Sequence, residues 1–229
     1  MKLRDQAYQR FTLGLLAREI HAGQFVSQRE LAAITGMTLG AIRELIPRLE
    51  ADGLIRTVPQ RGIQIAHVDV NLIRNAFGFR LLVEREAFAR FAERASDEEL
   101  DRLQSDHEAV LKAAAKGVTP ALVARAQSID DGMHAAVVDA LGNEIVSNVY
   151  RVNSIKIRLI RQAQTTLRDD LIVPVMRNHL AIIAALRTRD PARAAAAITS
   201  HINDARDRAL GVEPAPPRAV RAVNTREVT

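Results

Sequence analysis

Apolar residues recur at helical spacing along most of this chain, and this pattern predicts a protein that is mainly α-helical. The first such pattern covers residues 5–22, and Gly23 ends it. Ser27 and Glu30 then have the spacing of a capping box, in which the serine accepts a free backbone N–H and the glutamate reaches back. These two residues predict a short second helix that runs through Ile34.

A third helix is predicted from its cap at Thr38 to Asp52, just before a glycine. Two runs rich in β-branched residues, 54–58 and 63–65, follow as a hairpin with a glycine at its turn. Three helices and a hairpin in this order are typical of a winged helix-turn-helix domain, which we assign to residues 1–66.

Beyond residue 66 the helical pattern resumes without further strand signals, and it predicts an all-α six-helix bundle over residues 67–211. Capping serines, prolines in first turns and a Gly-Asn break mark where these helices begin and end. The last residues, 212–229, are rich in proline and have no apolar period, so we expect a disordered tail. The six predicted helices cover residues 70–94, 97–116, 119–140, 143–167, 171–188 and 191–209.

Composition narrows the class of protein. The hydrophobic fraction is 48% but the aromatic fraction is only 3%, which favours helices packed through aliphatic side chains over a strand-rich core. The chain has no cysteine, so any metal must be held by histidine and carboxylate groups. It also has no long apolar run and no export signal, so we expect a soluble, cytoplasmic protein without a membrane segment.

Positive charge is concentrated in the predicted winged domain. Residues 1–66 carry nine lysine and arginine residues against six acidic ones, whereas residues 67–211 carry twenty against nineteen. In winged domains the third helix enters the major groove of DNA, and the wing contacts the backbone or the minor groove. Arg43, Arg48 and Arg61 are the cations best placed for these contacts, which makes double-stranded DNA the expected partner. The alternative is an ordinary helical hairpin with solvated arginines.

Five short motifs lie in this region: Gln28-Arg-Glu-Leu-Ala32, Gly36-Met-Thr38, Ile42-Arg-Glu44, Arg48 to Ile55, and Arg61-Gly-Ile63. Together they resemble the DNA-binding domain of the GntR family of bacterial transcription regulators. The resemblance implies that five residues lie at the DNA, namely Arg29, Thr38, Arg43, Arg61 and Gly62.

Two features depart from that family pattern. Leu39 and Gly40 stand where an arginine is usual, so one common base contact is missing. Pro47 lies inside the predicted third helix, where it removes a hydrogen bond and predicts a local kink.

A second group of candidate residues lies in the helical region. Asp130 and His134 are four residues apart, so a helix places them on one face. His134, His179 and His201 each fall on the apolar stripe of a predicted helix, and all three should therefore point inward. Buried polar groups are costly unless they are hydrogen-bonded or bind a metal, so the four side chains suggest a shared partner. The alternative is that each is a core histidine bonded to a backbone carbonyl, as we expect for His107.

Three imidazoles and one carboxylate suit a divalent ion such as Zn, Ni, Mn or Fe and leave coordination positions open. The Asp-x-x-x-His pair, the segment from Asn178 to Leu186 and the later histidine resemble the ligand-sensing FCD domain of the FadR branch of GntR regulators. The six-helix count is similar to the VanR-like subgroup of that branch. The resemblance implies a divalent metal, with zinc expected in the purified protein, that helps to bind a small organic acid. The implied metal ligands are Asp130, His134, His179 and His201.

Three arginines are candidates for contacting that acid. Arg80 matches an arginine of the family's first sensor helix and could hold a carboxylate through two hydrogen bonds. The alternative for Arg80 is an ion pair with Glu84, four residues later. Arg158 and Arg161 belong to a cationic stripe on the fourth sensor helix, which is either part of the pocket or a solvated face.

These features predict a DNA-binding transcription regulator, not an enzyme, that binds a palindromic operator as a homodimer. The family resemblance implies that it is a repressor. A small carboxylic acid or sugar acid at the metal would control its operator affinity. Two alternatives stay open. The same four residues could activate water in a metal-dependent enzyme, although no general base stands at motif spacing. The metal ion itself could also be the signal that the protein senses.

Overall fold

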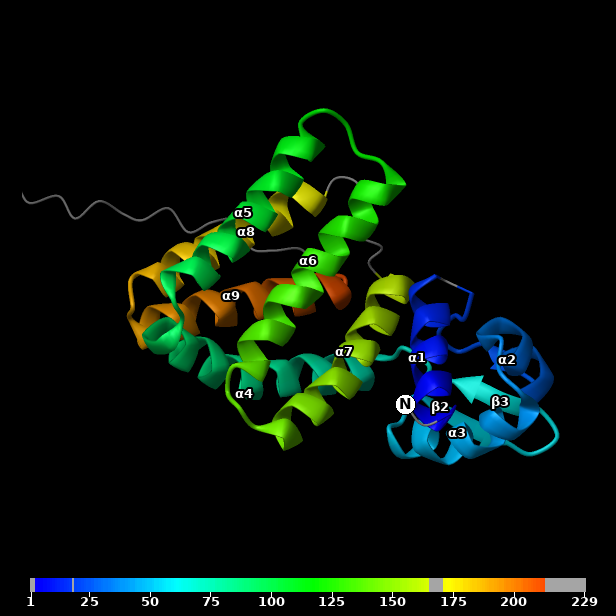
Figure 1. Cartoon of the computed structure of the whole chain (residues 1–229). Helices are drawn as coiled ribbons and strands as arrows, with labels where there is room; N and C mark the ends of the chain where they lie inside the picture. The colour runs from blue at the N-terminus through cyan, green and yellow to red at the C-terminus, as the bar shows by residue number, and fades with distance from the viewer. Residues whose placement is uncertain (1–2, 18, 165–170, 213–229) are drawn as a thin grey trace, which may run out of the picture.

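The computed structural model describes residues 3–17, 19–164 and 171–212, which form an N-terminal winged domain and a C-terminal helical domain (Figure 1). The winged domain consists of α1 (Leu3–Leu16), β1 (Phe25–Val26), α2 (Gln28–Thr35), α3 (Leu39–Ala51), β2 (Ile55–Val58) and β3 (Gly62–Ile65). The mainly helical fold class, with a winged helix-turn-helix unit first, is therefore confirmed.

Local side-chain chemistry explains where α2 and α3 begin. The Ser27 side chain accepts a hydrogen bond from the Glu30 N–H at 3.1 Å, and Glu30 accepts one from the Ser27 N–H at 2.6 Å, as the capping box predicts. Thr38 caps α3 by accepting a hydrogen bond from the Ala41 N–H. The helix then continues through Pro47 without interruption, so the proline does not end it.

Helix α1 ends earlier than residue 22, where the sequence pattern places its end. The helix stops at Leu16, and the backbone N–H groups of Glu19 and Ile20 turn back to the Gly14 carbonyl. Ile20 is fully buried over Gly14, where a Cβ atom would lie 3.1 Å from the Ile20 Cδ1. The apolar spacing correctly identifies Ile20 as a buried residue. Ile20 does not belong to a helix, however, but to a turn that packs against Gly14.

The three strands form an antiparallel sheet in the order β1-β3-β2. The hairpin of β2 and β3 is the predicted wing, whereas the sequence does not predict β1, because it consists of only Phe25 and Val26. Gly62, at the start of β3, has a φ of 92°, and a Cβ there would lie 2.9 Å from the Val26 carbonyl oxygen. The fold itself therefore requires glycine at this position of the wing.

Six helices form the described part of the C-terminal domain, as the sequence predicts. They are α4 (Val70–Arg94), α5 (Asp97–Ala114), α6 (Pro120–Asp139), α7 (Glu144–Gln164), α8 (Ile172–Arg187) and α9 (Pro191–Ala209). A second capping box, Ser96 with Glu99, opens α5, and prolines occupy the first turns of α6 and α9. The end predicted for the fourth helix, 165–167, lies outside the described residues, as does the predicted tail from residue 213 onward.

Helix α4 is central to the helical domain. It packs along α9 and α7 and also contacts α6 and α8, while α5 packs on α8 (Figure 1). Helix α7 also lies beside α1 of the winged domain, where the Gln162 side chain donates a hydrogen bond to the Leu15 carbonyl. The apolar core is continuous from one domain to the other. Within the described ranges, no helix is long and apolar enough to cross a membrane.

Candidate metal centre

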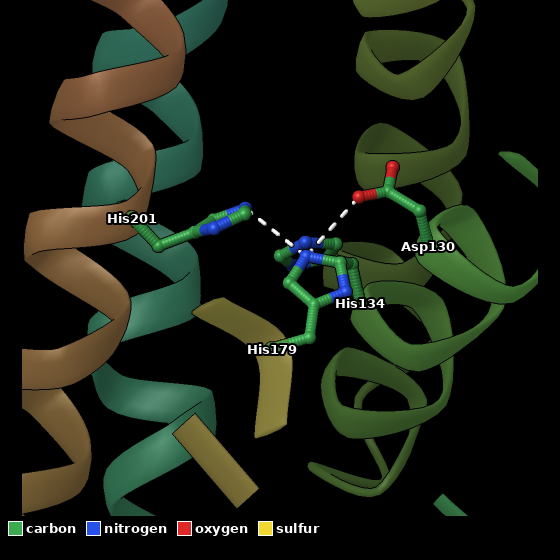
Figure 2. A group of neighbouring side chains, drawn as sticks. All are labelled: Asp130, His134, His179 and His201. Carbon is green, nitrogen blue, oxygen red and sulfur yellow. Dashed lines mark hydrogen bonds and ion pairs between the residues drawn. The ribbon is translucent and has the colours of Figure 1, made fainter. Parts of the chain in front are cut away.

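Four polar side chains meet in the interior of the helical domain (Figure 2). Asp130 and His134 come from α6, His179 from α8 and His201 from α9. One ligand atom of each residue lies within 4.8 Å of those of the other three, and none of the four residues is more than 3% exposed. The structure thus brings together all four residues that the sequence predicts as metal ligands.

The helical repeat explains this convergence. Asp130 and His134 are about one turn apart on α6, and Val137 continues the same buried stripe. On α8 and α9 the histidines likewise interrupt stripes of buried aliphatic residues. Packing these stripes against each other therefore forces the polar groups to one point in the core.

Two of the histidines are held through Nδ1 by an oxygen acceptor. The Nδ1 of His134 lies 2.7 Å from Oε2 of Glu84 on α4 and donates its proton to that carboxylate. The Nδ1 of His201 lies 2.9 Å from Oδ1 of Asn178 and donates in the same way. In both rings the proton on Nδ1 leaves the lone pair of Nε2 free.

His179 is held by another histidine. Its Nδ1 lies 3.0 Å from Nε2 of His107 on α5, and the Nδ1 of His107 lies 2.6 Å from the Leu103 carbonyl oxygen. A carbonyl only accepts, so His107 carries its proton on Nδ1 and accepts from His179 at Nε2. His107 is thus a core histidine bonded to a backbone carbonyl, as the sequence predicts, and its second ring nitrogen also contacts the candidate metal ligand His179.

Glu84 is the centre of a buried charged network behind His134. It accepts hydrogen bonds from Arg80 Nε at 2.5 Å and from the Tyr150 hydroxyl at 2.8 Å, in addition to His134. Arg80 Nη2 also lies 3.1 Å from His134 Nδ1, but the guanidinium only donates, so the carboxylate between the two groups carries the interaction. Burial opposes ionisation of Glu84, but Arg80 and His134 together hold its pKa well below the ordinary value.

Asp130 directs one oxygen to the histidines and the other to Arg161. Its Oδ1 lies 3.1 Å from His179 Nε2. Its Oδ2 lies 2.5 Å from Arg161 Nη2, in an ion pair that is not aligned as a hydrogen bond. Burial raises the pKa of this carboxyl, but Arg161 and His179 more than offset the effect, so the pKa lies well below its ordinary value. Asp130 is therefore anionic near neutral pH, as a carboxylate that binds a cation must be.

Burial also favours the neutral, metal-binding form of the imidazoles. It lowers the pKa of His179 to about 4, although the hydrogen bond with Asp130 opposes this shift. Burial lowers the pKa values of His107 and His201 as well. Because metals bind imidazole only in its deprotonated form, the site needs little proton release from these residues at pH 7.

These contacts fit a divalent metal ion. In the part of the chain that the structure describes, His134 Nε2 is a buried nitrogen without a hydrogen-bond partner. The Nε2 atoms of His179 and His201 face each other at 3.4 Å, and with both Nδ1 atoms protonated this brings two lone pairs together. A cation between these nitrogens would remove the repulsion. Three imidazole nitrogens and a carboxylate, without thiolate, form a donor set that suits Zn, Ni, Mn or Fe.

The three predicted effector arginines lie close to this centre, and each has a carboxylate partner. Arg80 forms a buried ion pair with Glu84, which is the alternative that the sequence offers to an effector contact. Arg158 and Arg161 both contact Asp131, at 2.8 Å and 3.1 Å, so they face α6. The stripe on α7 is therefore not a purely solvated face at these two positions, and a contact of the three arginines with an effector stays a prediction.

Two small cavities adjoin the centre, and both have Arg161 in their walls. The larger, about 50 Å³, is lined in part by Asp130, His201 and Arg208. The smaller, about 10 Å³, reaches His134. One water molecule needs about 10–15 Å³ of such a cavity, so the larger cavity has room for a few water molecules and the smaller for about one at most.

The residues predicted at DNA lie on the outer surface of the winged domain, with one exception. The Arg61 guanidinium stacks on the Phe25 ring, 4.0 Å from its centroid, and so holds its position on the wing. Gly62 beside it is half-buried. The exposed residues of this set are Arg29, Thr38, Arg43 and Arg61.

Arg48 is the exception, because it faces the other domain. It forms an ion pair with Asp5 at 2.9 Å and covers the Tyr8 ring, and both of these partners belong to α1. It also lines a cleft of about 900 Å³ between the domains, together with residues of α7 such as Tyr150 and Arg158. The Arg48 side chain therefore lies at the junction between the two domains.

The chain matches two known families over most of its length. Residues 75–204 match the FCD domain, and residues 3–65 match bacterial regulatory proteins of the gntR family. A curated relative, described as the uncharacterized HTH-type transcriptional regulator YdhC of Bacillus subtilis (strain 168), is 23% identical over 181 residues, which is 79% of each chain.

Solved structures share the fold at low sequence identity. E. coli McbR/YncC has a TM-score of 0.72 and 16% identity, with 89% of this chain and 95% of that chain covered. A structure described as the metal-free FCD domain of TM0439 has a TM-score of 0.53 and 20% identity, with 64% of this chain and 96% of that chain covered.

Proposed function

This chain belongs to the GntR family of bacterial regulatory proteins and carries an FCD domain, so it is a transcription regulator, and we propose that it is a repressor controlled by a small carboxylic acid or sugar acid. The winged domain would bind a palindromic operator in the cytoplasm, as one half of a homodimer. The acid would bind at a divalent metal ion in the helical domain and weaken operator binding.

The observation that carries this proposal is the convergence of three imidazole Nε2 atoms and one carboxylate in a buried centre. Asp130, His134, His179 and His201 would hold the ion, and their hydrogen-bonded partners fix the orientation of each histidine. A bound divalent ion would supply a positive charge with open positions for a carboxylate. Zn, Ni, Mn and Fe all suit this donor set, and zinc is the ion expected in purified protein.

Cationic side chains around the centre support an acid as the effector. Arg161 and Arg208 line the larger cavity beside Asp130, and Arg80 lies behind His134. Arg161 is the best candidate for a carboxylate clamp, because it already pairs with Asp130 and with Asp131 of α6. If Asp130 binds a metal ion, Arg161 can exchange that partner for the carboxylate of the effector.

The winged domain carries the proposed DNA contacts on its exposed surface. Arg43 and Thr38 stand at the first turns of α3, where a recognition helix meets base edges, and Arg61 stands on the wing. Arg29 would contact phosphate from the start of α2, and Gly62 lets the wing backbone adopt its required conformation. We leave Arg48 out of this set because its partners lie on α1.

The contact between α7 and α1 offers a route from the ligand to the DNA-binding domain. Helix α7 carries Arg158 and Arg161 toward the centre and Gln162 toward the Leu15 carbonyl of α1. A ligand that changes the partners of Arg161 would therefore act on the helix that touches the winged domain. Such a ligand alters operator affinity only as far as it binds the two conformations differently.

The small size of the cavities favours a second candidate, a regulator that senses the metal ion itself. The two cavities, of about 50 Å³ and 10 Å³, admit an ion but little of an organic acid unless Arg161 or α7 moves. In this case metal binding alone would change operator affinity.

Operator binding under defined metal and ligand conditions tests both candidates. Purified protein is stripped with a chelator, reloaded with zinc and titrated onto the DNA upstream of its own gene, with random DNA as the control at physiological salt. A panel of small carboxylates and sugar acids is then added. We expect operator release that needs both zinc and one class of acid. Release by zinc alone would select the metal sensor, and equal affinity for both DNAs would overturn the regulator proposal.

A further inference from the structure

We infer that His107 is a positioning residue for the metal centre, which holds the ligand His179 in the tautomer and orientation that a metal ion needs. This inference rests on the proposed metal site and adds a residue outside its four ligands. His107 lies on α5, a helix that supplies none of those ligands.

The geometry forms a chain of two hydrogen bonds that ends at the centre. His107 is fully buried, and its Nδ1 is fixed by the Leu103 carbonyl one turn earlier on the same helix, at 2.6 Å. Its Nε2 lies 3.0 Å from Nδ1 of His179, and the two rings meet edge to face with an interplanar angle of 70°. Because the Nδ1–H of His107 donates to the Leu103 carbonyl, the Nε2 that faces His179 is unprotonated and acts as an acceptor.

This acceptor favours one of the two tautomers of His179. A neutral imidazole carries one proton, and on His179 that proton can lie on Nδ1, toward His107, or on Nε2, toward Asp130 Oδ1 at 3.1 Å. Only the first tautomer leaves Nε2 unprotonated toward the metal. His107 favours this tautomer by accepting a hydrogen bond from the Nδ1–H of His179, whereas Asp130 alone would favour the other.

The three histidine ligands therefore have three different partners. Glu84 gives His134 a carboxylate acceptor, and Asn178 gives His201 an amide acceptor. His107 gives His179 a neutral ring acceptor of fixed orientation, which adds no charge to a centre that already contains Asp130 and Glu84. Partners of this kind set the tautomer of a ligand and raise its basicity, and their loss typically weakens metal binding about 10- to 100-fold.

Zinc affinity of three single variants of the full chain tests the inference. His107→Phe keeps a buried ring but removes the acceptor, so we expect zinc affinity, measured by competition with a chromogenic chelator, to fall about 10- to 100-fold. His107→Gln can present its amide oxygen near the position of Nε2 and should restore most of the affinity. Val110→Ala removes a buried side chain from the same helix without touching this chain of hydrogen bonds, and should bind zinc like the wild type.

A measurement on wild-type protein keeps the test independent of folding defects. In the zinc-loaded protein, long-range ¹H–¹⁵N correlation of the imidazole rings should find protons on Nδ1 of both His107 and His179. Finding the proton of His107 on Nε2 instead would overturn the inference, as would wild-type zinc affinity in folded His107→Phe. Wild-type protein that binds no zinc would instead overturn the metal site itself, and this inference with it.

Discussion

The two domains differ in whether they bury charged side chains. Among the described residues of the winged domain, the buried side chains are apolar except for Thr35, whose hydroxyl donates to the Leu31 carbonyl of its own helix. The helical domain instead buries Arg80, Glu84 and Asp130, together with four histidines, in the middle of its core. The winged domain thus rests on apolar packing alone, whereas the helical domain keeps several charged groups away from water.

This difference has an energetic consequence. A buried ion pair loses hydration and is seldom a net source of stability, but removing one partner strands the other in the core. An exposed ion pair contributes little in either case. The stability of the helical domain should therefore depend on its polar cluster being complete, and the stability of the winged domain should not depend on its ion pairs.

The sharpest test compares one buried and one exposed carboxylate. Glu84→Gln leaves Arg80 without its counter-ion, so we expect a loss of about 3–5 kcal/mol in the free energy of unfolding. Asp5→Asn breaks the pair with Arg48, whose side chains are 42% and 39% exposed, and should cost no more than about 1 kcal/mol. Urea unfolding followed by circular dichroism measures both. Similar losses of unfolding free energy in the two variants would show that the helical domain does not depend on its buried ion pair more than the winged domain depends on its exposed one.

Removing a candidate metal ligand should weaken zinc binding far more than removing an exposed histidine. Structural zinc sites with four ligands bind with roughly 10–16 kcal/mol, so one ligand accounts for about 3 kcal/mol, and His201→Ala should lower zinc affinity about 100-fold or more. His67→Ala, which removes an exposed histidine, serves as the control. Chelator competition gives the affinities. Unchanged zinc binding by His201→Ala would exclude His201 as a ligand.

Acid should destabilise the metal-free helical domain through its histidines. Burial lowers the pKa of His179 from 6.5 to about 4, so between these pH values the unfolded chain takes up a proton that the folded chain does not. The folded state therefore loses stability as pH falls through this window, by about 3 kcal/mol for this residue, and burial of His201 acts with the same sign. Urea unfolding in EDTA at several pH values measures the loss, and His179→Leu should reduce it. Unfolding free energies that stay flat between pH 6.5 and 4 would contradict this account.

The smallest effect is expected for a single DNA contact. Arg61→Ala removes an exposed cation of the wing and should weaken operator binding by about 1–3 kcal/mol if the arginine reads a base. If it contacts only phosphate, affinity should fall evenly for all DNA sequences, and the salt dependence should become less steep. Arg102→Ala, on the surface of α5, is the matched control, and fluorescence anisotropy measures both. Zinc affinity should stay the same in both variants, and a change in it would show that the wing affects the metal centre.

Most of the fold follows from the sequence because its signals are local. The capping boxes at Ser27 and Ser96 mark the starts of α2 and α5, and apolar periods place the six helices of the described C-terminal domain. Two runs of β-branched residues with a glycine between them place the wing hairpin. The end of α1 and strand β1 do not follow, because each depends on a contact with another segment. Gly14 accommodates Ile20 in the first case, and β3 pairs with a two-residue strand in the second.

The candidate site could be predicted only in part, for a similar reason. Helical phase identifies Asp130 and the three histidines as inward-facing, and they do meet. The partners behind them come from other helices: His107 is 72 residues from His179, and Glu84 is 50 residues from His134. No periodicity along one helix can indicate such a pairing, so the sequence shows which groups are buried but not which groups they face.

Helix α4 runs from the end of the wing to the candidate metal centre. It begins at Val70, five residues after the last strand of the wing, and carries Glu84 to the network behind His134. At 1.5 Å per residue, roughly 21 Å of helix separates Val70 from Glu84. Such a helix is a lever: a tilt of about 10° around Glu84 would move its first turn by about 4 Å, close to the ~3.4 Å rise of one base pair. A small tilt at Glu84 would thus become a larger displacement at the end of the helix that adjoins the winged domain.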